Sequence, residues 1–163
     1  MEQRRATVEL LRRVIGRRLD AVTEARHWYA GRRDGDAESL VHFWLHFEGV
    51  PPVMAHSTGE HLLLEFAEPY ASYDMREYGE TRVEPAQPPD VLAAYKGQLL
   101  LNVAPIQGYS SEPSAGGVQL RFEHEDLVVV SLGDEWLLTQ GPVPAQFAAY
   151  LTVGDWLVSQ TGK

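Results

Sequence analysis

The chain has 163 residues, of which 44% are hydrophobic, and a formal net charge of −9 at pH 7. This length and composition predict one globular domain over residues 1–163 with a sizeable core, and exclude a disordered chain. The absence of cysteine excludes disulfides, thiol nucleophiles and cysteine-based zinc sites, and fits a reducing cytoplasm.

The charge is unevenly distributed along the sequence. Residues 1–33 hold nine arginines and four acids, whereas residues 34–163 carry a net charge of −14. The arginines and the nearby Trp28 would suit contacts with nucleic acid, but the acidic remainder would repel a phosphate backbone, so we do not expect that partner. Twelve arginines against two lysines indicate a GC-rich, bacterial genome.

The first predicted element is a helix at 7–15, because apolar residues recur there at helical spacing and Gly16 follows as a stop signal. A short strand at 17–22 and a polar loop at 24–38 come next. The start of the chain is basic and lacks an apolar run, so we expect no signal peptide. The same three elements return later in the chain, as a helix at 89–96, a strand at 98–103 and a polar loop at 104–116.

Strict alternation after the first loop predicts a strand in which Phe43, Leu45 and Phe47 face the core. Trp44 falls on the opposite face, where we expect it to be available to a partner unless a loop of the same chain covers it. After the second loop, Leu120 and Phe122 continue the inward pattern. Turn signals then predict hairpin loops at 123–126 and 133–134.

The two halves also match in sequence. Residues 43–63, aligned on 118–138 at an offset of 75, are identical at seven of 21 positions, where average composition gives about one or two. The match predicts a tandem duplication. The identical pairs are Leu45/Leu120, Phe47/Phe122, Glu48/Glu123, Val53/Val128, Glu60/Glu135, Leu62/Leu137 and Leu63/Leu138.

These patterns predict an α+β domain of two tandem units, each a short helix followed by an antiparallel meander, with about eight strands in all. The units span about 7–66 and 89–139, and a connector lies at about 67–88. Residues 75–83 are interpreted as an additional edge strand. The tail at 144–158 fits either a closing helix or a last strand.

Acidic residues gather at the predicted hairpin ends, and we expect adjacent ends to bring them together as a binding face. The duplicated pair Glu60 and Glu135 could instead face each other across a pseudo-two-fold axis and hold a cation or act as acid and base. The acids of the binding face are Glu123, Glu125, Asp126, Asp134 and Glu135.

The six histidines do not have metal-site spacing, so we expect no metal and no cofactor. Motifs for nucleotide binding or a serine nucleophile are also absent. The sequence therefore predicts a non-enzymatic acidic binding module, of the inhibitor or immunity type, that engages a basic protein. The alternatives are a small-ligand or cation-dependent enzyme that uses the duplicated glutamates, and a structural homodimer.

Overall fold

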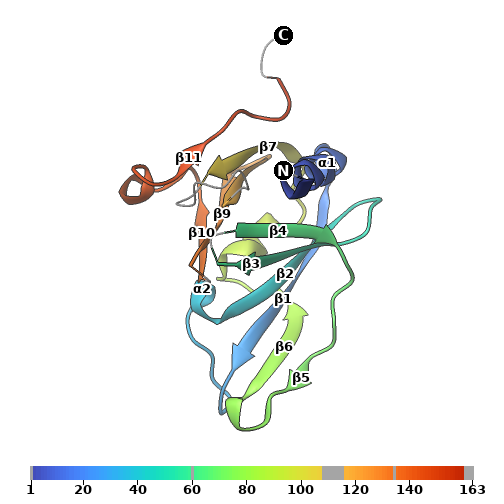
Figure 1. Cartoon of the computed structure of the whole chain (residues 1–163). Coiled ribbons are helices and arrows are strands. Elements are labelled where there is room, and N and C mark those ends of the chain that lie inside the picture. Colours follow the sequence, from blue (N-terminus) through green and yellow to red (C-terminus); the bar gives the residue numbers. More distant parts are fainter. Residues whose placement is uncertain (1, 60, 108–115, 134, 160–163) are drawn as a thin grey trace.

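Two antiparallel sheets form the fold, and the computed structural model describes residues 2–59, 61–107, 116–133 and 135–159. The first six strands are β1 (Leu19–Trp28), β2 (Leu40–Phe47), β3 (Val53–Thr58), β4 (His61–Phe66), β5 (Tyr73–Asp74) and β6 (Glu80–Pro85). The other five are β7 (Leu100–Gln107), β8 (Gly117–Phe122), β9 (Asp126–Leu132), β10 (Glu135–Gln140) and β11 (Thr152–Val153). The larger sheet has the order β4-β3-β2-β1-β6-β5 and the smaller β10-β9-β8-β7-β11 (Figure 1).

Helices form a small part of the described chain. The longest is α1 (Glu2–Val14), and the others are α2 (Asp36–Ser39) and the 3₁₀ turns η1 (Arg76–Tyr78), η2 (Val91–Tyr95) and η3 (Ala145–Phe147). Antiparallel sheets with separate helices confirm the predicted α+β class. No helix in the described part of the chain is both long and apolar enough to cross a bilayer.

The main core lies between the two sheets and under α1. Phe43 of β2 packs against Trp136 of β10, with ring centroids 5.2 Å apart. Phe47 and Phe122 are both buried in this core, as the alternation predicted. One face of α1 adds Leu11 and Val14 to it, and the exposed Arg12 and Arg13 lie in the last turn, where they complement the helix dipole.

The two sheets are joined where β1 and β7 begin. Arg18 and Leu99 form an isolated antiparallel bridge, and four backbone hydrogen bonds surround it. Gly16 N–H donates to Leu100 and Gly97 N–H to Leu19, while Leu19 N–H donates to Gln98 and Leu100 N–H to Arg17. The bond from Gly16 is equivalent to the bond from Gly97, and the bond from Leu19 is equivalent to the bond from Leu100. This junction, which we call the seam, is therefore locally symmetric.

The strands are more numerous and longer than expected, with eleven in the described residues instead of about eight. The segment after residue 24, interpreted as a loop, continues β1 to Trp28 and pairs with both β2 and β6. The start of the second polar loop likewise continues β7 to Gln107. The helix expected at 89–96 is the 3₁₀ turn η2. The polar residues at the end of β1 suggested a loop, but they belong to a strand. Their charged side chains lie on a face of the strand that other segments of the chain cover.

The connector and the tail add strands to both sheets. The connector contains β5, η1 and β6, so the expected edge strand is a short hairpin whose inner strand pairs with β1. The tail forms both η3 and the two-residue β11, which pairs with β7.

The expected exposure of Trp44 is wrong, because its side chain is 0% exposed. The connector residue Tyr70 lies against it, with ring centroids 5.0 Å apart. Alternation assigned the correct face of β2, but that face is covered by the chain itself and offers no tryptophan to a partner.

Candidate functional site

The acids predicted to form one binding face lie at two ends of the smaller sheet. Glu123, Glu125 and Asp126 are at the β8–β9 turn, whereas Glu135 pairs with Leu132 at the other end of β9. Seven residues of β9 separate the ends by about 20 Å. Successive turns of a meander lie at opposite ends of the shared strand, so the structure does not bring these acids together.

Two of the three acids at the β8–β9 turn have structural partners. Glu123 accepts a hydrogen bond from Leu99 N–H at 2.9 Å, and this bond, followed by the charge of Arg18, lowers the pKa of its carboxyl. Asp126 accepts from Gln119 at 2.7 Å and pairs with Arg121. The third acid, Glu125, is exposed.

The alternative acid pair is only partly described. Glu60 and Asp134 lie outside the described residues. The end of β3 meets β9, because the Ser131 hydroxyl donates to the Gly59 carbonyl at 2.7 Å. Glu135 is exposed at the start of β10.

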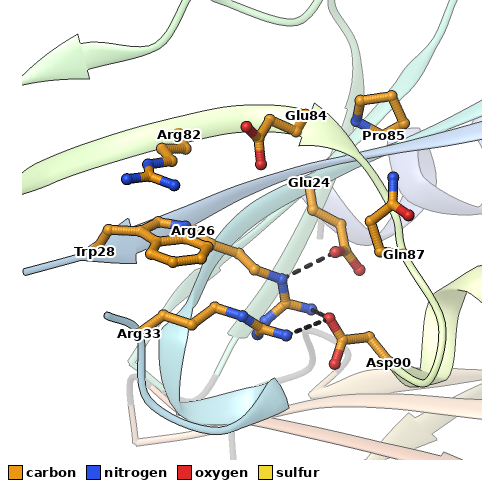
Figure 2. Close-up of a pocket in the computed structure, with 9 residues that line it drawn as sticks. All are labelled: Glu24, Arg26, Trp28, Arg33, Arg82, Glu84, Pro85, Gln87 and Asp90. Carbon is orange, nitrogen blue, oxygen red and sulfur yellow. Dashed lines mark hydrogen bonds and ion pairs between the residues drawn. The ribbon is translucent and has the colours of Figure 1, made fainter. Parts of the chain in front are cut away.

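The candidate site that the structure reveals is a charged pocket of about 290 Å³ on β1 and β6 (Figure 2). It occupies the same face of β1 as the core residue Val22, at the end of the sheet that extends past the smaller sheet. The turn before η2 and the loop before α2 complete it. Its lining residues are Glu24, Arg26, Trp28, Arg33, Arg82, Glu84, Pro85, Gln87 and Asp90.

Cross-strand register places like charges opposite each other in this pocket. Successive pairs along β1 and β6 are Glu24 with Glu84, Arg26 with Arg82 and Trp28 with Glu80. Like charges directly opposite on neighbouring strands destabilise a sheet. Either other groups of the protein or a bound ligand must therefore compensate these like charges.

Arg26, which is 5% exposed, is compensated within the chain. Its guanidinium donates to Glu24 at 2.9 Å, to the Asp36 carboxylate at 2.6 Å and to the Ser39 hydroxyl at 2.9 Å. Burial opposes the charge of Arg26, but the hydrogen bonds to Glu24 and Asp36 outweigh it and raise its pKa. Asp36 also accepts from Val91 N–H, so the arginine ties β1 to α2 and η2.

The other two arginines are also held by carboxylates. Arg33 donates to Asp90 at 2.6 Å. Arg82 donates to Glu80 at 2.9 Å and lies over the Trp28 ring, 4.0 Å from its centroid. All three guanidinium groups of the pocket therefore have anionic partners.

The carboxylates are not all satisfied in the same way. Glu24 is 4% exposed, and its Oε2 is buried without a hydrogen-bond partner among the described residues. Burial raises the pKa of Glu24, and the hydrogen bond from Arg26 only partly opposes this. The exposed Glu84 has no ion pair within the described ranges. Three arginines face five carboxylates when Glu80 and Asp36 are included, so the fully ionised pocket has a net charge of −2.

His42 and His56 lie together on the other face of the larger sheet, with ring centroids 5.7 Å apart. His42 Nδ1 lies 2.5 Å from the Tyr70 hydroxyl, and His56 lies 3.3 Å from Glu65. Burial raises the pKa of Tyr70 to about 12, so this hydroxyl stays protonated. No group of three or more metal-ligating side chains occurs among the residues that the structure describes.

Sequence reasoning missed this pocket, although a signal was present. Charged residues alternate with others at 24–28 and again at 80–84, which is the period of a strand. The pairing of β1 with β6, which joins segments far apart in the sequence, could not be read from either segment alone.

No protein-family model, curated protein or solved structure matches the chain. The function must therefore be argued from the geometry of the pocket and its surroundings.

Proposed function

We propose that the chain is a non-enzymatic binding module for a basic protein, and that the partner docks at the end of the larger sheet that carries the charged pocket. The observation that carries this proposal is the pair Glu24 and Glu84, which lie directly opposite each other and keep unused acceptor capacity. A chain charge of −9 favours the same class of partner.

Exposed tyrosines at the same end of the larger sheet as the pocket support a protein partner, which can contact them beyond the pocket, over a lone ion. Tyr29, Tyr73 and Tyr78 are 59%, 47% and 68% exposed. They belong to one end of the sheet, because Tyr73 pairs with Thr81 of β6 and His27 contacts the Tyr78 carbonyl at 2.7 Å. Tyr73 shares the face of Thr81 and packs against Tyr70, so it lies on the face opposite the pocket. Tyrosine is enriched in protein interfaces, and its ring attracts cations.

The proposal is tested with a fluorescently labelled arginine-rich peptide and a glutamate-rich peptide of equal length, titrated by anisotropy. We expect the protein to bind only the basic peptide, and Glu84→Lys to weaken this binding roughly tenfold, because the reversed charge repels the peptide at its contact site. Glu125→Lys is the matched control: it changes the net charge equally, at the β8–β9 turn of the smaller sheet, and Glu125 does not line the pocket.

Equal weakening by the two variants would contradict the proposal, since it would mean diffuse attraction to an acidic body without a site. Preference for the acidic peptide would also contradict it.

We further propose that the units 7–66 and 89–139 arose by tandem duplication in a bacterial, cytoplasmic protein. The equal order of four strands in each unit supports this origin, as does the seam, whose backbone bonds are equivalent in the two units. The absence of cysteine fits the location.

A further inference from the structure

We infer that the charged pocket accepts one arginine side chain of the partner, with its guanidinium held between the carboxylates of Glu24 and Glu84. This inference rests on the proposed function and specifies the chemical group that the pocket recognises.

The geometry of the two strands provides the place for that group. Glu24 and Glu84 are in direct register, so their Cβ atoms lie about 5 Å apart on one face of the sheet. Arg26 satisfies only one oxygen of Glu24. Figure 2 shows the Glu24 carboxylate between Arg26 and Gln87, with Glu84 on the neighbouring strand. A guanidinium that reaches past the exposed Gln87 can donate to both carboxylates and remove their repulsion.

The charges of the pocket favour a cation over an anion. Each of its three arginines already donates to a carboxylate, at 2.6 to 2.9 Å. A phosphate or carboxylate ligand would have to displace one of these ion pairs. A cation instead finds a net charge of −2 and one buried oxygen without a partner among the described residues.

The shape of the acceptors favours arginine over lysine. A guanidinium presents five donors in a planar fork and is more weakly hydrated than an ammonium, so it loses less on entering a pocket. Arg82 lies over the Trp28 ring, 4.0 Å from its centroid, so that ring face is already covered and the carboxylates are the groups left for the ligand. A volume of about 290 Å³ lies at the lower end of the range for ligand pockets and suits a single side chain.

The test uses N-acetyl-arginine amide as the probe, with the lysine and citrulline derivatives for comparison. Citrulline keeps the shape of arginine but lacks its charge. The readout is the indole N–H resonance of Trp28 in the folded, ¹⁵N-labelled protein, assigned with Trp28→Phe. We expect the arginine derivative to shift this resonance with a millimolar dissociation constant, the lysine derivative to bind more weakly and the citrulline derivative not to bind.

Glu84→Gln is the deciding variant, because Glu84 is exposed and has no ion pair within the described ranges. It should weaken binding of the arginine derivative about tenfold, which is the effect of one charge-assisted hydrogen bond. Glu125→Gln should leave this binding unchanged. A citrulline derivative that binds as well as arginine, or a Glu84→Gln variant without effect, would overturn the inference.

The peptide experiment separates the two proposals. An absent Trp28 shift, together with basic-peptide binding that still depends on Glu84, would overturn the arginine pocket and leave the binding module standing. Loss of both signals would overturn both.

Discussion

Replacing Arg26 with methionine removes the shared cation of the pocket while keeping a side chain of similar length. Glu24, Asp36 and Asp90 lie within 3.5 Å of its guanidinium nitrogens, and Glu24 and Asp90 are buried. Breaking a buried ion pair from one side costs about 3–5 kcal/mol, because the remaining charges are left without compensation. This is a large part of the roughly 5–15 kcal/mol that typically stabilises a domain.

The assay is urea denaturation followed by tryptophan fluorescence at about pH 7 and about pH 5. The loss should shrink at the lower pH, because burial already raises the pKa of Glu24 and protonation neutralises this carboxylate once its partner is gone. Arg12→Met, on the exposed face of α1, is the control and should change the free energy of unfolding by less than about 0.5 kcal/mol.

Adding Glu24→Gln to Arg26→Met should recover part of the lost stability, because it removes one buried charge that the first change left unpaired. If Arg26→Met cost less than about 1 kcal/mol at pH 7, or cost more at the lower pH, the charge network would not hold α2 and η2 against β1 as described.

Three further predictions concern the rest of the fold. Trp44→Ala should destabilise the protein as strongly as Phe47→Ala, by about 3–5 kcal/mol each in denaturant melts, because both side chains are buried. A Trp44→Ala variant of unchanged stability would mean that Tyr70 does not cover Trp44. Burial lowers the pKa of His42 and of His46, so the free energy of unfolding from denaturant melts should be highest above about pH 6.5. Below that pH it should fall by up to about 1.4 kcal/mol per pH unit for each histidine, and His42→Gln should flatten the profile. Gly79→Ala should lower the free energy of unfolding by about 1–3 kcal/mol, which is more than Gly31→Ala should. Both glycines have positive φ, but only at Gly79 would a Cβ collide with the Trp28 carbonyl. Equal melting temperatures of the two variants would contradict this contact.

Local patterns predicted much of the fold. Alternation placed Phe47 and Phe122 correctly in the core, and turn residues placed the β8–β9 hairpin, because both signals act over a few residues. The candidate site could not be predicted in this way. Glu24 and Glu84 become neighbours only through the pairing of β1 with β6, which neither segment reveals by itself. The burial of Trp44 likewise depends on Tyr70, which lies in the connector, beyond two further strands of the chain.

The order of the two sheets along the chain has a consequence for biosynthesis. The four strands β1 to β4 are complete once residue 66 has been made, but strands β7 to β10 of the sheet that covers their apolar face are complete only at residue 140. At about 5–20 residues per second, a ribosome needs about 4–15 s to make the intervening segment. During that interval Phe43, Leu45 and Phe47 have no opposing sheet, so the nascent chain is most open to aggregation and to chaperones when it is half made.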